Sequence, residues 1–507
     1  MMSTGSNLVL MLVKAATTFI LTPITLRALG RYDYGIWEMV TAVVGYMGVL
    51  ELGLKPAVSR YTARFNAQAD DTQLRAMYST ALLMLGIVGG FALIFFSAWA
   101  LFRPDLVAPD GAPTTRYSIF LVLIGLQLLI TFPGHVAESV LEGLQQYSTK
   151  NNITIVNSLT GLAAVYFLIE HFDALIFLAL INGMGTTTKY IVFFRLVHKR
   201  TNGRLFPTLR YRSKAFFKEL VGFSSKSFVQ GASTSLEGYA PVLIIGSVLG
   251  PAQVVFYSLP LALIRQVRNL TWTLTHAFMP LFSELHAKEQ SEAAKHIFVL
   301  ASRFVVGLVV PIAALIILLG PDFLGRWAGQ EYVSGAASVV GLLAAANLLG
   351  FANPFASRYL TAIGQHGILA KIGPFSAVSS IALGLILVGP MGLYGPPTGQ
   401  VAVACVVVPL TLYVTCQRVG ITLFHYTGAV LVRFILPAAL LVATVLALAK
   451  ALPPTTYPRL ALLSAAGGMV YLLSAPFLAM SRAERKEIIS WIRRRRGAKP
   501  SSDSPAG

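Results

Sequence analysis

The chain has 507 residues, of which 55% are hydrophobic and 12% are charged, and its formal net charge is +19. Soluble domains average about 25% charged residues, so the composition excludes an ordinary soluble protein. The basic surplus lies mostly between apolar runs and in the C-terminal tail, which favours a role in membrane orientation over nucleic-acid binding.

Apolar runs long enough to cross a bilayer recur from one end of the chain to the other, and they predict an all-α integral membrane fold with about fourteen transmembrane helices. The expected spans are 8–27, 36–57, 79–101, 117–138, 153–170, 174–194, 224–249, 254–280, 298–319, 335–355, 373–390, 396–416, 428–449 and 459–479. Basic residues concentrate in alternate loops, so we expect both termini in the cytoplasm.

Short matches recur about 220 positions apart. Leu29-Gly30 matches Leu249-Gly250, each between two spans, and LEGLQQ from Leu141 resembles LTAIGQ from Leu360. The repeat unit contains six spans. Because this number is even, the second half enters the membrane from the same side as the first, so the two halves have the same orientation, as in parallel-repeat transporters. The predicted parts are an N-lobe at 1–197, a basic cytoplasmic linker at 198–223, a C-lobe at 224–418, two accessory spans in 419–480 and a basic amphipathic tail at 481–507.

Three stretches carry a family resemblance. LGRYDYGIW runs from Leu29 to Trp37, ELGLKPAVSRY from Glu51 to Tyr61, and GPDFLGRWAGQEYVSGA from Gly320 to Ala336. They resemble the oligosaccharide (O-antigen type) flippase family of the multidrug/oligosaccharidyl-lipid/polysaccharide exporter superfamily. The resemblance implies two six-helix lobes, a central cavity and alternating access. It also implies that a polyprenyl-pyrophosphate-linked oligosaccharide moves from the inner to the outer leaflet of the bacterial cytoplasmic membrane, for surface polysaccharide biosynthesis.

Arg265 and Arg268 lie in the middle of the apolar segment 254–280. A central arginine costs about 2.5–3.5 kcal/mol on membrane insertion, so the pair requires water, a counter-charge or a ligand. The two residues are three positions apart and share one face of a helix. A guanidinium can donate two hydrogen bonds to one phosphate, so we predict a pyrophosphate site here; the alternative is a structural salt bridge or hydrogen bonds between the lobes to backbone carbonyl groups.

Three further charged residues within the predicted spans are candidates for the transport path. Lys14 is about one-third of the way into the first span, and we expect it either to line the cavity or to extend to the inner headgroups. Lys226 and Glu237 both lie in the seventh span and can share a face. We predict that Lys226 adds to the cationic cavity and that Glu237 is a counter-ion or a coupling group.

A sugar path also needs polar and aromatic side chains. The candidates for lining it are Tyr46, Gln127, Tyr239, Tyr257 and Trp272. Each of these alone is more often found in packing or at the membrane interface. Glu51, near the inner end of the second span, is expected to form a local ion pair with Lys55.

The sequence contains no nucleotide-binding loop and no metal-ligand spacing, so we expect a transporter with no catalytic residues, metal or cofactor, coupled to H⁺ or Na⁺ or driven by membrane potential. One alternative is a cation-coupled exporter of small molecules, whose apolar substrates need fewer cavity cations. Another is a membrane glycan polymerase or ligase, which should carry a larger outer loop than 102–116. The expected partners are the lipid-linked oligosaccharide, anionic lipids and other polysaccharide assembly proteins.

Overall fold

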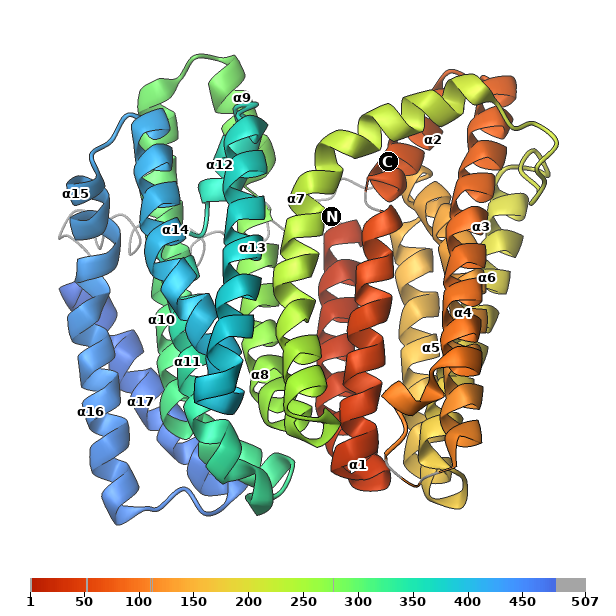
Figure 1. Ribbon diagram of the computed structural model, residues 1–507. Coiled ribbons are helices and arrows are strands. Elements are labelled where there is room, and N and C mark those ends of the chain that lie inside the picture. Colours follow the sequence, from red (N-terminus) through yellow and green to blue (C-terminus); the bar gives the residue numbers. More distant parts are fainter. Residues whose placement is uncertain (1, 52, 110, 112, 277, 480–507) are drawn as a thin grey trace, which may run out of the picture. The chain divides into compact units, whose positions relative to one another are not determined.

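The computed structural model describes residues 2–479 except 52, 110, 112 and 277; the side chains of 2–4, 223–228, 230, 334 and 366 and the predicted tail at 481–507 lie outside the described part. Every regular element in that part is helical (Figure 1). The α-helices are α1 (Met2–Met47), α2 (Leu54–Ala67), α3 (Asp71–Phe102), α4 (Thr114–Gly143), α5 (Tyr147–Leu168), α6 (Ala174–Arg200), α7 (Lys214–Val248), α8 (Pro251–His276), α9 (Met279–Ala287), α10 (Ser291–Trp327), α11 (Val333–Phe351), α12 (Ala356–Ala362), α13 (His366–Met391), α14 (Gly395–Val419), α15 (Leu423–Tyr426), α16 (Ile435–Ala451) and α17 (Tyr457–Leu478). Short 3₁₀ segments are η1 (Gly48–Glu51), η2 (Pro104–Leu106), η3 (Ile169–His171), η4 (Gln330–Tyr332), η5 (Gly392–Tyr394) and η7 (Val432–Phe434), and η6 (Thr427–Leu431) is a π-helix.

Ten segments of the described chain are long and apolar enough to cross a membrane. Two of them, Gly5–Glu51 and Gly367–Val419, are interrupted by Gly30 and by η5, so each holds two lengths of spanning helix. Helices α7 and α8 are also long enough to span but are less apolar, because they carry several of the charged residues of interest. The predicted all-α membrane fold is therefore confirmed.

The second predicted span, 36–57, is too long at its C-terminal end. Helix α1 ends at Met47, and Gly53 adopts a left-handed conformation (φ 89°) immediately before α2. Helices α2, α9 and α12 are short elements that lie mostly in segments predicted to be loops, and only the starts of α2 and α9 fall within predicted spans. Hydropathy detects apolar length, and it is insensitive to a change of helix direction at a glycine.

The predicted internal repeat is visible in the backbone. Positive φ angles recur in pairs: Gly30 and Gly250, Ala69 and Glu289, and Gln145 and Gly364. The partners are 220 residues apart in the first two pairs and 219 apart in the third. Gly30, with φ 72° and ψ 178°, breaks α1 between its two spanning lengths in a conformation that side-chain-bearing residues rarely adopt. The two halves of the sequence thus repeat one order of helices and turns.

The chain forms two compact units. The first comprises the chain up to Ser258 together with Ala370–Gly399, and the second comprises Leu259–Leu369 with the chain from Gln400 onward. Within the first unit, α3 packs on α4, α4 on α6, and α1 on both α5 and α7. The lobe boundaries inferred from hydropathy, with a linker at 198–223, stay a prediction.

Glycines allow α1 and α7 of the first unit to approach closely. A Cβ on Gly45 would lie 2.3 Å from the ring of Tyr239, and one on Gly246 would lie 2.3 Å from Sδ of Met39. Small residues at such crossings are typical of membrane helix pairs, because lipid supplies no hydrophobic force to bring helices together and close van der Waals contact must do so.

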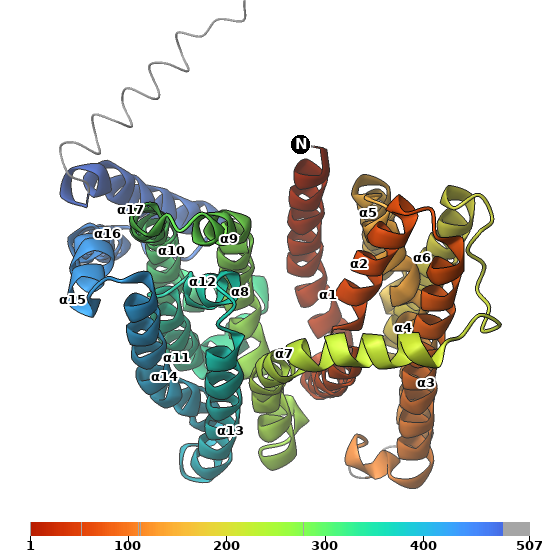
Figure 2. The same cartoon turned by 90° about the horizontal axis from the view of Figure 1, so that it is seen from above.

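The first turns of α7 lie beside α2 and α3 (Figure 2). The ring of Phe216 contacts Phe65 and Tyr61, with centroid distances of 5.7 and 6.4 Å. Burial raises the pKa of the Tyr61 phenol, and the hydrogen bond and charge of Glu219 raise it further. This aromatic contact fixes the start of α7 against the short helix α2.

The second unit has an aromatic core. Phe282 of α9 contacts Phe355 and Tyr359, at centroid distances of 5.7 and 5.4 Å, and all three are buried. Tyr426 donates a hydrogen bond of 2.9 Å to the carbonyl oxygen of Ala352, which satisfies its buried hydroxyl. The core fixes α9 and α12 next to each other, and this places the C-terminal end of α8 close to α12.

Candidate functional site

Four side chains form a stripe along α8: Arg265, Arg268, Trp272 and His276. Their spacing of three, four and four residues puts them on one helix face. Arg265 is half-buried, Arg268 and His276 are exposed, and Trp272 is 55% exposed. The rings of Trp272 and His276 stack, with centroids 4.7 Å apart and planes at 19°. We call these four residues the α8 stripe.

A third arginine joins the stripe from α12. The Cζ atom of Arg358 lies 5.4 Å from the ring centroid of Trp272, in cation–π geometry, and the side chain is half-buried. Sequence analysis did not include Arg358 or His276 in this site. The three- and four-residue spacing could have revealed His276, but the approach of Arg358 depends on the turn between α11 and α12.

The arginines of this site are not neutralised by protein groups. In the described part of the chain, Arg265, Arg268 and Arg358 make no hydrogen bond and no ion pair. The structural salt bridge that was the alternative explanation of the Arg265 and Arg268 pair is therefore absent among these residues. Guanidinium groups in a membrane protein need water or an anion, so the α8 stripe and Arg358 have the chemistry of an anion site with an aromatic platform.

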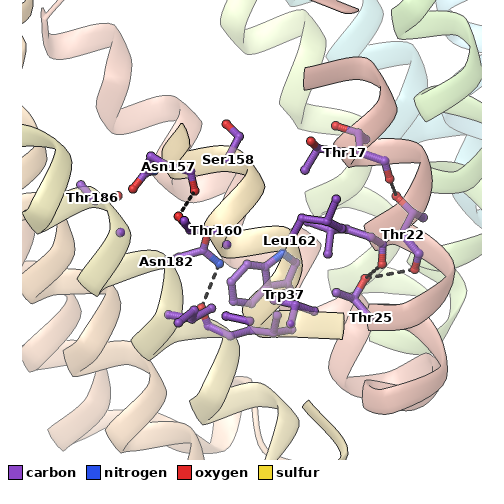
Figure 3. A pocket seen from close by; sticks show the side chains of 18 of the residues that line it. Thr17, Thr22, Thr25, Trp37, Asn157, Ser158, Thr160, Leu162, Asn182 and Thr186 are labelled. Atoms are coloured by element: carbon purple, nitrogen blue, oxygen red, sulfur yellow. Dashed lines mark hydrogen bonds between the residues drawn. The ribbon is translucent and has the colours of Figure 1, made fainter. Parts of the chain in front are cut away.

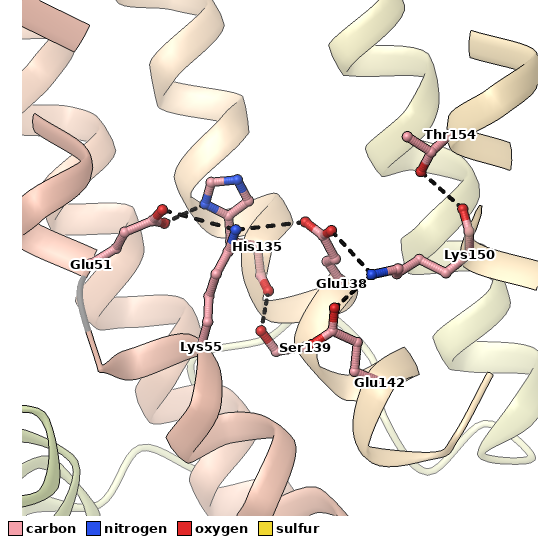
Figure 4. Close-up of polar contacts among 8 residues, drawn as sticks. All are labelled: Glu51, Lys55, His135, Glu138, Ser139, Glu142, Lys150 and Thr154. Atoms are coloured by element: carbon pink, nitrogen blue, oxygen red, sulfur yellow. Dashed lines mark hydrogen bonds and ion pairs between the residues drawn. The ribbon is translucent and has the colours of Figure 1, made fainter. Parts of the chain in front are cut away.

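A second charged cluster lies in the first unit and joins η1, α2, α4 and α5. This charge network comprises Glu51, Lys55, His135, Glu138, Glu142 and Lys150 (Figure 4). Nζ of Lys55 is 3.9 Å from Glu51 and 3.8 Å from Glu138, and Nζ of Lys150 is 3.6 Å from Glu138 and 2.6 Å from Glu142. Nδ1 of His135 contacts the Glu51 carboxylate directly. The expected ion pair of Glu51 with Lys55 is confirmed.

Lys14 and Lys189 are close enough to this network for their charges to interact with those of Glu138, Lys55 and Lys150. Lys14 is exposed, and within the described residues its ammonium makes no hydrogen bond or ion pair. Sequence analysis missed His135, although His135, Glu138 and Glu142 are three and four residues apart on α4.

The other predicted polar residues have separate surroundings. Glu237 accepts a hydrogen bond from Ser376 of α13 at 3.4 Å, and Gln127 is half-buried on α4. The side chain of Lys226 lies outside the described residues. Glu237 is on α7, whereas the charge network is built on η1, α2, α4 and α5.

The tyrosines predicted to line a sugar path are packed against other protein groups and do not project into open space. The rings of Tyr46 and Tyr239 meet edge to face at 5.7 Å, and Tyr46 donates a hydrogen bond of 3.2 Å to the carbonyl oxygen of Leu236. Tyr257 is 1% exposed, so its ring presents no open surface. Of the five candidates for lining a sugar path, Trp272 is the one with most of its ring exposed.

A polar cavity of about 560 Å³ lies between α1, α5 and α6 of the first unit (Figure 3). Hydroxyl and amide side chains form much of its wall: Thr17, Thr18, Thr22, Thr25, Asn157, Ser158, Thr160, Asn182 and Thr186. Trp37, Glu38 and apolar residues such as Leu21, Leu162 and Ile181 supply the rest. The volume is within the range of small-molecule sites, and the wall combines apolar surface with an unusually large set of hydroxyl groups. This cavity had no counterpart in the sequence analysis.

Many of the hydroxyl and amide donors in the wall of this cavity are already hydrogen-bonded to backbone carbonyl oxygens of their own helices. Thr22 donates to the carbonyl oxygen of Thr18 at 2.8 Å, Ser158 to that of Thr154 at 2.9 Å, and Asn182 to that of Leu178 at 2.8 Å. The oxygen lone pairs of these hydroxyls stay available. The wall therefore offers mainly acceptors, and it suits a neutral ligand rich in hydroxyl donors.

Comparison with known proteins supports a common origin and fold. Residues 2–286 match the family model described as polysaccharide biosynthesis protein. A Shigella flexneri protein named "Putative O-antigen transporter" is 21% identical over 379 residues, which cover 73% of this chain and 86% of that protein.

Solved structures share the architecture at low identity. The lipid II flippase MurJ in an inward closed conformation has a TM-score of 0.71 at 9% identity, with 94% of this chain and 98% of that chain covered. An inward-facing multidrug resistance MATE family transporter of the MOP superfamily has a TM-score of 0.67 at 14% identity, covering 80% and 94%. These likenesses establish the fold, and the family match covers more than half of the sequence. The chain belongs to the polysaccharide biosynthesis protein family.

Proposed function

We propose that this protein is a flippase that moves a polyprenyl-pyrophosphate-linked oligosaccharide from the inner to the outer leaflet of the bacterial cytoplasmic membrane by alternating access, without covalent catalysis. The observation that carries the proposal is the α8 stripe with Arg358: three guanidinium groups make no hydrogen bond or ion pair with the residues that the structure describes, and that of Arg358 lies over an exposed indole ring. The name of the Shigella relative supports the same class of substrate.

The chemistry of the two units matches the parts of such a substrate. Arg265, Arg268 and Arg358 are suited to a pyrophosphate, because each can donate paired hydrogen bonds to phosphate oxygens. Trp272 offers a face on which a sugar ring can stack. The acceptor-rich cavity of α1, α5 and α6 is suited to uncharged sugar units. Lys14 adds an unpaired positive charge on α1.

A small-molecule exporter with the same fold is the main competing function. Such a transporter handles apolar or cationic compounds, for which three unneutralised arginines would be repulsive or unnecessary.

We further propose that both termini are cytoplasmic and that transport is coupled to H⁺ or Na⁺. Glu237 and the charge network around Glu138 supply the carboxylates able to bind the cation.

Deletion of the gene tests the transported substrate. Cells without the protein should accumulate lipid-linked oligosaccharide on the inner leaflet and lose surface glycan. A polymerase or ligase defect would instead leave the lipid-linked units accessible on the outer leaflet. Accumulation on the outer leaflet, or normal glycan display, would refute the flippase assignment.

Paired substitutions test the site. Arg265→Gln with Arg268→Gln should reduce flipping by at least about tenfold while the protein remains inserted, since each charge-assisted hydrogen bond contributes about 1.5–3 kcal/mol. Lysine at both positions should retain part of the activity, because the charge remains and the planar fork is lost. Arg418→Gln is the matched control: it removes an exposed arginine near the end of α14 that is not in the stripe.

A further inference from the structure

The structure assigns a second anion site, for a phosphate group, to a pocket between the start of α3 and the basic segment that leads into α7. The pocket has a volume of about 260 Å³. Its walls are formed by Arg75, Tyr78 and Ser79 of α3 and by residues 203–206, 208, 210 and 211 of the basic segment. This site lies entirely in the first unit and contains none of the residues proposed to handle the transported substrate.

Three buried donors at the pocket have no hydrogen-bond partner among the residues that the structure describes. Nε of Arg75, the hydroxyl of Tyr78 and the hydroxyl of Ser79 are buried atoms without a hydrogen bond, and Tyr78 and Ser79 are each 1% exposed. These residues are three and four positions apart, so they lie on one face of α3. Buried donors are normally satisfied, and three orphaned ones at a single pocket indicate a ligand that supplies acceptor oxygens.

The charge of the pocket selects an anion. Arg75, Arg204 and Arg210 line it, and no carboxylate is among its lining residues. The nearby carboxylate of Asp71 is bound by Nη1 of Arg204 at 2.7 Å, which leaves two positive charges uncompensated at the site. Arg75 also lies over the ring of Tyr211, with 5.7 Å from Cζ to the centroid. Two net positive charges and hydroxyl donors complement a phosphate group.

The pocket is built on a fixed part of the chain. The backbone N–H of Ser213 donates to Oγ1 of Thr80 at 2.9 Å, and Nη1 of Arg204 donates to Oδ1 of Asp71 at 2.7 Å. The basic segment is thereby tied to α3 at both ends of the pocket. A phosphate bound here would bridge α3 and this segment and hold the start of α7 in place.

The phosphate could belong to an anionic lipid headgroup or to a soluble compound, and the experiment separates the two. Purified full-length protein is placed in nanodiscs of phosphatidylcholine, with or without phosphatidylglycerol, and inorganic pyrophosphate is added to the phosphatidylcholine discs. Hydrogen exchange of amides 203–213 is measured. Slower exchange with phosphatidylglycerol identifies a headgroup, and slower exchange with pyrophosphate identifies a soluble anion; either result supports the site.

Variants at the pocket decide whether the effect is specific. Arg75→Gln should weaken the apparent affinity at least about tenfold, the loss expected for one charge-assisted hydrogen bond. Ser79→Ala is a second variant that keeps the charge and removes one orphaned donor. Arg212→Gln is the matched control, because it removes an exposed arginine of the same segment that does not line the pocket. The proposal is overturned if neither anion slows exchange, or if Arg75→Gln and Ser79→Ala respond like Arg212→Gln.

Discussion

The guanidinium of Arg358 lies over the indole ring of Trp272, with 5.4 Å between Cζ and the ring centroid. The ring of His276, one turn further along α8, stacks on the same indole with its centroid 4.7 Å away. The guanidinium and the imidazole hold the indole in one orientation, and 55% of the Trp272 residue stays exposed and accessible to a ligand.

Removal of the indole ring should weaken substrate binding more than a change of aromatic type. Trp272→Ala should lower the affinity for lipid-linked oligosaccharide about fivefold to thirtyfold, since the lost cation–π and stacking contacts are each worth about 0.5–1 kcal/mol. Trp272→Phe should retain most of the affinity. Binding of purified protein to the lipid-linked substrate measures both, and equal affinities for the alanine variant and the wild type would contradict a role for the ring.

Glu138 should be a stability determinant of the first unit. It is the carboxylate shared by Lys55 and Lys150, so Glu138→Gln leaves two lysine charges with less compensation. We expect the free energy of unfolding to fall by about 2 kcal/mol. This loss is smaller than that for a fully buried ion pair, because the Glu138 carboxylate is partly exposed. Thermal unfolding in detergent measures it. The control is Glu292→Gln, whose pair with Lys295 is at the surface and should contribute little.

The first unit should be acid-sensitive at Asp173, which precedes the first residue of α6. Burial disfavours its charged form, but hydrogen bonds from Arg116 and from the backbone N–H of Ile176 outweigh burial and lower its pKa. A lowered pKa in the folded state adds stability above the unfolded-state value, about 3.9, and this stability is lost as the pH falls below it.

Asp173→Asn separates this charge from helix capping, because asparagine can still accept the backbone N–H groups at the start of α6. The variant should be less stable than the wild type near neutral pH, and the difference should shrink as the pH falls below about 4. Unfolding temperatures at several pH values test this. A difference that is independent of pH would show that the carboxylate charge does not contribute.

The cavity of α1, α5 and α6 can be filled without disturbing the backbone. Gly161 lines it, and a Cβ there would meet no atom within 4 Å. Gly161→Leu should therefore reduce surface glycan while the protein remains inserted, if sugar units occupy this space. Gly86→Leu on α3 is the matched control, since a Cβ there also meets open space and Gly86 does not line the cavity. Unchanged glycan display in Gly161→Leu would remove the cavity from the substrate path.

The helical membrane fold could be predicted in detail because its determinants are local. Apolar length placed the predicted spans on helices of the structure, with ends that differ by up to ten residues, and the error at 36–57 arose where Gly53 redirects the chain into α2. The repeat was detectable from Leu29-Gly30 and its match because a positive φ angle restricts the residue type at Gly30 and Gly250.

The functional residues were only partly predictable. Arg265, Arg268 and Trp272 could be assigned to one face of a helix from spacing alone. Tyr257 has the same aromatic character as Trp272, but it is buried, and no feature of the sequence distinguishes the two environments. Burial depends on which helices pack against a given face, and hydropathy does not contain that information.

The sequence by itself determined the membrane-spanning helices, their order, the repeated turns and the shared face of the two arginines, since each depends on residues within a few turns of one another. Only the tertiary structure decided that Arg358 meets Trp272, that His135 meets Glu51, and that Arg75, Tyr78 and Ser79 face a basic segment more than a hundred residues later. These contacts join distant parts of the chain. They exist because helix packing, rather than local periodicity, sets which side chains come within a few ångströms of each other.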